Sequence, residues 1–324
     1  MAGVFAAEPP YDDVVYDDVV RRLRSAGCVF AEEEARLLIE AAVERSAGSA
    51  WVPGGPVDGD SVDGGPADGG LAAMVARRAA GHPLEHVLGW AEFCGRRWAV
   101  GPGAFVPRRR SEFLVAVAAG LAPGAGSVLL DLCCGVGALG GAVAARIADR
   151  AGERVGDGTA DPGRTGDPGA GAAAVRLYAA DVEPAAVRYA RRNLAPFGGR
   201  VFEGDLYGPL PTELRGRVDV LVANAPYVPT GEIGLLPPEA REHEPLVALD
   251  GGADGVDVQR RVVAQAPGWL APGGHLLIET GEHQADLTAA AFERAGLRTR
   301  VVADDELGAT VVVGRRAPEP PIAG

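Results

Sequence analysis

The stretch Val218-Asp219-Val220-Leu221-Val222-Ala223-Asn224-Ala225-Pro226-Tyr227 joins an apolar run to a polar corner. The run 218–223 is typical of a buried strand. In open α/β sheets, ligands bind outside the carboxyl ends of the strands, which is where residues 224–227 fall. These four residues therefore mark a candidate site, although a strand followed by an ordinary proline turn has the same pattern.

Each residue of this corner has a property that suits it to hold a planar group. Asn224 offers a carbonyl acceptor and an NH2 donor. Pro226 fixes its own φ angle and restricts Ala225, and Tyr227 supplies a flat wall. Such a corner can grip a planar amide or amine and hold its nitrogen in place.

From residue 127 onward, strand and helix patterns alternate, which is the signature of a parallel sheet. We expect strands at 127–132, 175–180, 200–203, 218–223 and 275–279, and helices at 137–150, 184–194, 256–270 and 284–295. Two final strands, 297–303 and 310–314, are close enough in sequence to pair antiparallel. The sequence therefore predicts an α/β fold with a mostly parallel sheet and an antiparallel final strand.

The first strand of this series ends in a glycine-rich turn, Asp131-Leu132-Cys133-Cys134-Gly135-Val136-Gly137. Glycines let the backbone pass close to a ligand, and the following helix presents free N–H groups. The turn lacks the GxxxxGK[ST] pattern of a phosphate-binding loop. Its candidate cofactor-binding residues are Asp131, Cys133, Cys134, Gly135, Val136 and Gly137.

The next two strands end in acidic residues. Asp181-Val182-Glu183 follows the second strand, where a carboxylate can accept hydrogen bonds from two ribose hydroxyls. The alternative is a helix N-cap, because Pro184 begins a helix. Glu203-Gly204-Asp205-Leu206 follows the third strand and could flank an adenine. Asp181, Val182, Asp205 and Leu206 therefore join the candidates, and four sites at consecutive strand ends are more specific than any one alone.

The rest of the chain divides around this region. Residues 1–83 predict a small helical domain with helices in 11–47 and at about 71–80, interrupted by a flexible Gly/Pro/Asp-rich loop at 53–70. Residues 84–106 predict a β-hairpin linker, and 107–316 the sheet domain. Residues 152–171 are rich in Gly, Asp, Pro and Thr and predict a disordered surface insertion, and 317–324 form a tail.

Composition argues against several classes of function. The formal net charge is −13 and all 31 basic residues are arginine, so direct nucleic-acid binding is not expected. We find no secretory signal and no apolar stretch of membrane-spanning length. The four cysteines lack CxxC spacing and the five histidines lack metal-ligand spacing. We expect a cytoplasmic protein without a metal site or disulfides.

These motifs resemble those of class I S-adenosyl-L-methionine-dependent methyltransferases, which have a Rossmann-like fold. More closely, the chain is similar to the protein-(glutamine-N5) methyltransferases that modify peptide chain release factors, the HemK/PrmC family. The similarity runs from about residue 81 to 315. It is carried by the segment 81–89, Pro107-Arg108, Glu112, the glycine turn, Asp181, Gly204-Asp205, the corner 224–227 and the segment 244–255.

The resemblance implies a cofactor, a substrate and residue roles. The cofactor is S-adenosyl-L-methionine, held by the glycine turn, Asp181, residues 205–206 and the corner. Asn224 would accept a hydrogen bond from a substrate amide NH2, the backbone carbonyl of Ala225 would accept the second, and Tyr227 would pack on the substrate. The substrate would be a glutamine in a protein such as a release factor, docked by the N-terminal domain of a monomeric enzyme.

The chain departs from the family pattern at three places. The family corner is usually Asn-Pro-Pro-Tyr, whereas Ala225 stands here in place of the first proline. Cys133 replaces the first glycine of the cofactor turn, and Pro107-Arg108-Arg109-Arg110-Ser111-Glu112 replaces Pro-Arg-Pro-Glu-Thr-Glu. Alternative functions are an amino-methyltransferase acting on nucleic acid or on a small-molecule amide or amine, and a non-catalytic cofactor-binding paralogue.

Overall fold

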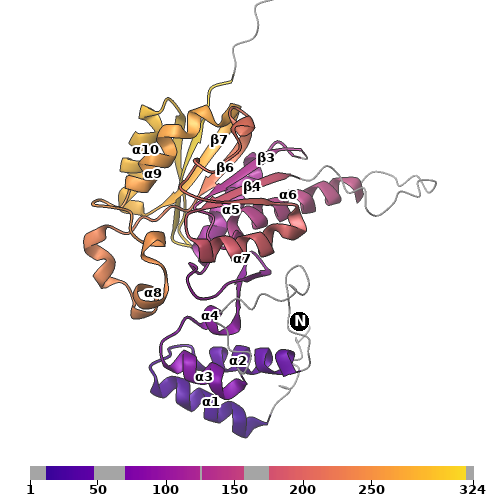
Figure 1. The fold of residues 1–324 in the computed structure, drawn as a ribbon, viewed down its shortest axis with the longest axis vertical. Helices are drawn as coiled ribbons and strands as arrows, with labels where there is room; N and C mark the ends of the chain where they lie inside the picture. The colour runs from indigo at the N-terminus through magenta and orange to yellow at the C-terminus, as the bar shows by residue number, and fades with distance from the viewer. Residues whose placement is uncertain (1–11, 47–69, 125, 157–174, 319–324) are drawn as a thin grey trace, which may run out of the picture.

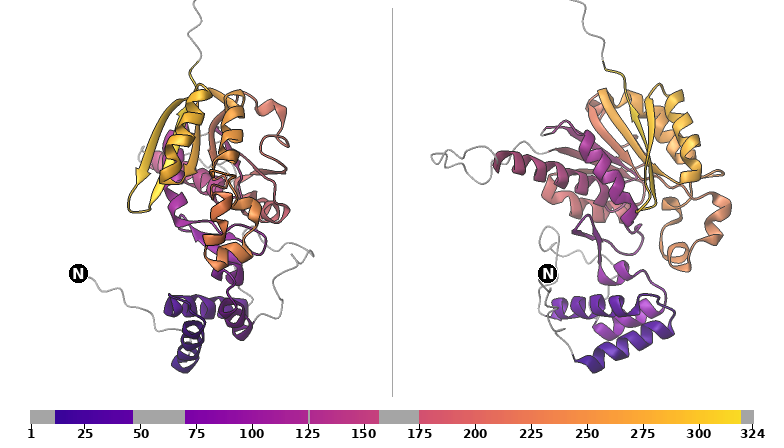
Figure 2. Two further views of the ribbon diagram at one scale, coloured as in Figure 1. Left: turned by 90° about the vertical axis from the view of Figure 1, so that its left-hand side faces the viewer. Right: turned by 180° about the vertical axis from the view of Figure 1, so that it is seen from behind.

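The computed structural model describes residues 12–46, 70–124, 126–156 and 175–318. A group of N-terminal helices lies beside a larger part built on a twisted sheet, and the two groups are separate in every view (Figures 1 and 2). The site depends on how the sheet is connected.

Seven strands form the main sheet within the described ranges. They are β3 (Val128–Leu132), β4 (Arg176–Asp181), β5 (Arg200–Glu203), β6 (Val218–Ala223), β7 (Leu270–Thr280), β8 (Arg298–Asp304) and β9 (Ala309–Arg315). Their order is β5-β4-β3-β6-β7-β9-β8, and each pairing is parallel except the two that involve β9. The predicted α/β fold with an antiparallel final strand is confirmed. The strand order reverses between β3 and β6, the point at which such sheets bind ligands.

Alternate residues of each strand pack against helices on opposite faces, as the pleat of a strand requires. Leu129 and Val220 belong to the apolar cluster that contains residues of α5 (Glu112–Leu121), α6 (Ala138–Gly156) and α7 (Pro184–Leu194). Their neighbours Leu130 and Leu221 belong to the second cluster, with residues of α9 (Asp257–Gln265) and α10 (Ala285–Arg294). A sheet buried on both faces exposes its strand ends, and the site lies there.

Within the described N-terminal ranges, 12–46 and 70–88, four helices enclose a third apolar cluster. They are α1 (Asp13–Ser25), α2 (Ala31–Ser46), α3 (Leu71–Ala79) and α4 (Leu84–Leu88). The cluster centres on the fully buried Leu23, Leu38 and Met74. Arg78 ties these helices to the sheet part, because it pairs with Glu34 of α2 and with Glu239 of α8 (Pro238–His243).

The hairpin predicted over 84–106 is wrong at both ends. Residues 84–88 form the helix α4, which follows Pro83 and ends at Gly89 with φ +80°. Proline is favoured at the start of a helix, and glycine in the left-handed conformation is favoured just after its end. The antiparallel pair is shorter, with β1 (Trp90–Phe93) against β2 (Arg96–Ala99). Gly101-Pro102-Gly103 then stops regular structure.

Two other predicted boundaries differ from the structure. Helix α6 continues to Gly156, so residues 152–156, predicted as part of a disordered insertion, are helical. One glycine lowers the stability of a helix by only about 1 kcal/mol, so Gly152 did not end α6. The remainder of that insertion, the loop 53–69 and the tail from 319 lie outside the described residues. Strand β7 begins at Leu270 and not at 275. The turn-forming residues Pro272-Gly273-Gly274 lie inside this strand as an irregularity. Val218 of β6 pairs with Leu270, and Val220 pairs with His275, so the register shifts between them.

Candidate active site

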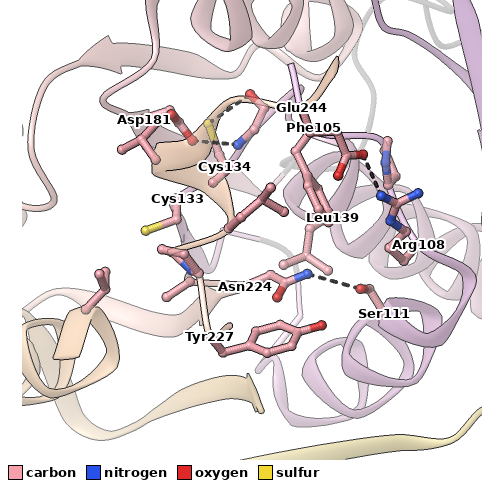
Figure 3. A pocket seen from close by; sticks show the side chains of 18 of the residues that line it. Phe105, Arg108, Ser111, Cys133, Cys134, Leu139, Asp181, Asn224, Tyr227 and Glu244 are labelled. Atoms are coloured by element: carbon pink, nitrogen blue, oxygen red, sulfur yellow. Dashed lines mark hydrogen bonds and ion pairs between the residues drawn. The ribbon is translucent and has the colours of Figure 1, made fainter. Parts of the chain in front are cut away.

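A cavity of about 830 Å³ lies at the carboxyl ends of β3, β4 and β6, and Figure 3 shows its walls. The predicted site residues that line it are Cys133, Cys134, Gly135, Val136, Asp181, Val182, Asp205, Leu206, Asn224, Ala225, Pro226 and Tyr227. Asp131 and Gly137 do not line it. The volume falls within the range of roughly 300–1,000 Å³ that is usual for cofactor sites.

The turn between β3 and α6 forms one wall with left-handed backbone. Cys133, Gly135 and Gly137 have φ angles of +54°, +53° and +78°. A Cβ added to Gly135 would have no atom within 4 Å, so this backbone faces open space. A Cβ on Gly137 would lie 2.9 Å from the Leu194 Cγ, so this glycine serves the packing of α6 on α7 instead.

Cys133 occupies a conformation that suits glycine. Left-handed backbone costs a non-glycine residue about 1–2 kcal/mol, and glycine costs roughly 0.5–1 kcal/mol in chain entropy. We therefore expect Cys133→Gly to raise the free energy of unfolding by up to about 1 kcal/mol in urea titrations. Cys134→Gly is the matched control and should lower it, because Cys134 is buried and lacks a positive φ. A loss of stability in Cys133→Gly would contradict the assignment of strain.

Asp181 links the second strand to this turn. Its Oδ2 accepts a hydrogen bond from the Gly135 amide at 2.8 Å, and its Oδ1 accepts one from the Glu183 amide at 2.9 Å. Burial raises the pKa of Asp181, and these backbone hydrogen bonds oppose that rise. The N-cap of α7 is Glu183, which accepts from the Ala185 amide. The capping alternative for Asp181 is therefore wrong, and its remaining lone pairs are available to a ligand.

Asp131, predicted to contact a cofactor, lies beneath the turn. It is 0% exposed, and its Oδ2 accepts from the Gly140 amide at 2.8 Å, which fastens the first turn of α6 to β3. Its Oδ1 has no hydrogen-bond partner. Burial, with the nearby charge of Asp181, raises the pKa of Asp131 to about 7.

This raised pKa predicts a pH dependence of stability. An unfolded aspartate titrates near a pKa of about 3.9, so the folded state binds this proton more tightly than the unfolded state does. The contribution of Asp131 to the free energy of unfolding should therefore fall as pH rises from about 4 to about 7. The difference between the wild-type and Asp131→Asn stability curves isolates this group, and curves that stay parallel across that range would contradict the prediction.

The third wall comes from the loop after β5. Leu206 is buried with φ +48° and packs in the cluster beneath α9. The exposed Asp205 forms an ion pair with Arg261 of α9, and both line the cavity. Arg261 was not predicted, because in sequence it is one more polar residue of an amphipathic helix.

The corner after β6 faces these loops from the opposite side. The Asn224 Nδ2 donates to the Ser111 Oγ at 3.2 Å, and the Asn224 amide oxygen points toward Tyr227 (Figure 3). Ala225 is fully buried. Ser111 lies 113 residues earlier, in a 3₁₀ turn (Arg109–Ser111) that leads into α5.

Two neighbours hold Tyr227. The Arg110 guanidinium lies 5.2 Å from the centre of its ring, and the Gln284 Nε2 donates to its carbonyl oxygen at 2.8 Å. A Cβ on Gly255 would come within 2.4 Å of the same oxygen, so only glycine fits there. The segment 244–255 thus packs directly against the corner.

An ion pair between a half-exposed arginine and a buried glutamate closes the outer rim. The Arg108 Nη2 donates to the Glu244 Oε1 at 2.5 Å, and Glu244 is 6% exposed. Burial raises the pKa of Glu244, and Arg108 opposes the rise. The pair joins the segment before α5 to the loop after α8, so two distant parts of the sequence form one rim.

The described ranges of the chain contain no group of three or more His, Cys, Asp or Glu side chains placed to hold a metal ion. None of their helices has the length and apolar character needed to cross a membrane.

Comparison with known proteins gives sequence relatives, while no protein-family model matches the chain. A release factor glutamine methyltransferase from Geobacter sulfurreducens is 38% identical, over 75% of this chain and 76% of its own. One of the same name from Rhodospirillum rubrum is 32% identical, over 93% of this chain and 85% of its own.

A third relative has a different name. A 4-amino-L-phenylalanine/4-methylamino-L-phenylalanine methyltransferase from Streptomyces pristinaespiralis is 32% identical, over 68% of this chain and 69% of its own. The relatives named for release factors reach higher identity or greater coverage. The chain therefore belongs to the release factor glutamine methyltransferase family.

Proposed function

We propose that this protein transfers a methyl group from S-adenosyl-L-methionine to the side-chain amide nitrogen of a glutamine in a peptide chain release factor, in the cytoplasm. The observation that carries the proposal is the corner Asn224–Tyr227, which faces the turn after β3, Asp181 and Leu206 across one cavity. In this proposal the N-terminal domain, residues 1–83, docks the substrate protein.

The cavity fits a nucleoside-containing sulfonium. Asp181 offers carboxylate lone pairs for ribose hydroxyls, and Gly135 faces open space, so a ligand can approach its backbone. Leu206, apolar and beside Asp205, suits an adenine face. When bound, S-adenosyl-L-methionine supplies an electrophilic methyl group on a positively charged sulfur.

An amide nitrogen is a poor nucleophile because its lone pair is delocalised into the carbonyl. In this mechanism the Asn224 Oδ1 and the Ala225 carbonyl oxygen accept the two N–H groups of the substrate amide. Holding both aims the nitrogen and favours loss of planarity, so catalysis is positioning and electrostatics. A backbone carbonyl does not depend on its side chain, so alanine in place of the usual proline keeps this acceptor.

A second candidate substrate is a small aromatic amine, favoured by the relative named for 4-amino-L-phenylalanine. The same two acceptors would hold an aniline NH2. A free aromatic amino acid needs no docking surface, whereas a release factor does. Dependence of activity on the N-terminal helices therefore separates the two substrates.

The test is a panel of acceptors. The full chain is incubated with methyl-labelled S-adenosyl-L-methionine and, separately, with a release factor, 4-amino-L-phenylalanine and duplex DNA. We expect label in the release factor, mapped to a glutamine by mass spectrometry. Label confined to the amino acid or to DNA would overturn the proposal in favour of that acceptor.

A further inference from the structure

The Gln284 side chain holds the end of the corner from behind. Its Nε2 donates to the carbonyl oxygen of Tyr227 at 2.8 Å and to that of Asp254 at 3.0 Å. Its Oε1 accepts from the Gly281 amide at 3.3 Å. Gln284 is 2% exposed and is not among the residues that line the cavity. Both protons of its NH2 group are therefore used, and neither is offered to a substrate.

These partners determine which way the Gln284 amide faces. A backbone carbonyl only accepts hydrogen bonds, and a backbone N–H only donates them. A reversed amide would place its oxygen against two carbonyl oxygens and its NH2 against the Gly281 N–H. A Cβ on Gly255 would lie 2.1 Å from the Gln284 Nε2, so the glycine there leaves the space that this NH2 occupies.

The corner is thus anchored at both of its ends. At its start the Asn224 side chain donates to Ser111, and at its end the Tyr227 carbonyl accepts from Gln284. The Ala225 carbonyl, which is the second acceptor in the proposed mechanism, lies between these anchors. A methyl side chain makes no hydrogen bond that could orient it. The direction of this carbonyl therefore depends on the two anchors.

The ring of Tyr227 is held from the same part of the sheet. Arg110 lies over the ring and forms an ion pair with the buried Glu279, near the end of β7. Gln284 belongs to the 3₁₀ turn Glu282–Gln284, which follows β7 directly. The end of β7 therefore supports both the carbonyl and the aromatic wall of Tyr227.

We propose that Gln284 is a positioning residue for methyl transfer. Its NH2 group fixes the Tyr227 peptide, and thereby the direction in which the Ala225 carbonyl and the Tyr227 ring meet the substrate. The inference rests on the proposed function, in which the substrate presents two N–H groups to the corner. Gln284 itself does not contact the substrate.

Loss of this anchor should displace the corner without unfolding it. Beyond Tyr227 the chain pairs with the segment 249–252. The Val228 amide donates to the Leu249 carbonyl at 3.0 Å, and the Gly251 amide donates to the Val228 carbonyl at 2.8 Å. These bonds do not involve Gln284, so they remain when it is replaced.

The first variant is Gln284→Met, which keeps the length of the side chain and removes both donors. Single-turnover methyl transfer to a release factor, with saturating S-adenosyl-L-methionine, should be about 10- to 100-fold slower, the scale of a misplaced reacting group. Cofactor affinity should be unchanged. The matched control is Gln259→Met, because Gln259 is 0% exposed and its side-chain partners lie in β7 and α10: Glu279, Thr280 and Thr288. This control should lower the melting temperature and keep a rate near that of wild type.

The second variant, Gln284→Glu, keeps the side-chain shape and adds a pH profile. An ionised carboxylate cannot donate, whereas a protonated carboxyl has one O–H that can. The rate of Gln284→Glu relative to wild type should therefore rise as the pH falls, and the relative rate of Gln284→Met should stay constant. Nearby charges, Glu282, His283 and the pair Asp254–Arg260, are present in both proteins, so the ratio isolates the introduced carboxyl. A constant ratio for Gln284→Glu would overturn the proposal.

A spectroscopic readout does not need methyl transfer. Tyr227-Val228 is the one Tyr-Val pair formed by the six tyrosines, so ¹³C at the tyrosine carbonyl with ¹⁵N in valine gives a single signal for this peptide. The signal should shift in Gln284→Met and not in Gln259→Met. An unmoved signal in Gln284→Met, or equal rate losses in the two methionine variants, would overturn the proposal. If wild type methylates no release factor while the signal shifts as expected, the proposed function fails and the hold of Gln284 on Tyr227 stands.

Discussion

Replacing Asn224 with alanine is expected to lower the single-turnover rate of methyl transfer about 10²–10³-fold, the usual cost of losing one positioned hydrogen bond in a water-poor site. The side chain lines the cavity and is oriented by Ser111. Folding should be little affected, because the Asn224 side chain makes this one hydrogen bond to a hydroxyl and ends a strand whose apolar residues stay in place.

Two measurements accompany this prediction. Calorimetry should show that Asn224→Ala binds S-adenosyl-L-methionine with little change in affinity, which separates a chemical defect from a binding defect. Asn224→Gln keeps the amide but moves it by one methylene group, and it should also be slow, because position and not chemical type is what matters. Wild-type rates in Asn224→Ala would mean that the corner is structural.

The second large effect is expected for Asp181→Ala, which should weaken cofactor binding by roughly 1–3 kcal/mol through loss of charge-assisted hydrogen bonds. That corresponds to an increase of about 5- to 150-fold in the dissociation constant. Asp181 also accepts from the Gly135 amide, so its removal loosens the turn as well.

The control for Asp181→Ala is Asp205→Ala. Asp205 is exposed and already paired with Arg261, so its loss should weaken binding less. Titration calorimetry measures both variants. An unchanged dissociation constant in Asp181→Ala would contradict the assignment of Asp181 to the cofactor.

The segments of the cavity wall that are continuous in sequence could be predicted from the sequence alone. Asp181, Leu206 and Asn224 each follow an apolar run, and a parallel sheet places the ends of such runs at one edge. Asp131 was also predicted to contact the cofactor, because it begins the same turn. Its side chain instead bonds the first turn of α6 and does not line the cavity.

Ser111, Arg110 and Glu279 could not be assigned from sequence. Ser111 contacts Asn224 across 113 residues, and Glu279 lies on another strand. No local pattern encodes contacts between residues so far apart in the chain. Similarly, Leu84–Leu88 reads as extended by its apolar residues, and the helix there depends on boundaries at Pro83 and Gly89.

In the proposed function, the corner Asn224–Tyr227 presents a protein glutamine for methylation. The most direct test is tandem mass spectrometry of a release factor after a single turnover with methyl-labelled S-adenosyl-L-methionine, with wild type and Asn224→Ala compared side by side. We expect one labelled methyl group on the side-chain nitrogen of a glutamine with wild type, and at most a trace with Asn224→Ala. A methyl group on any other residue type, or equal glutamine labelling by both proteins, would contradict it.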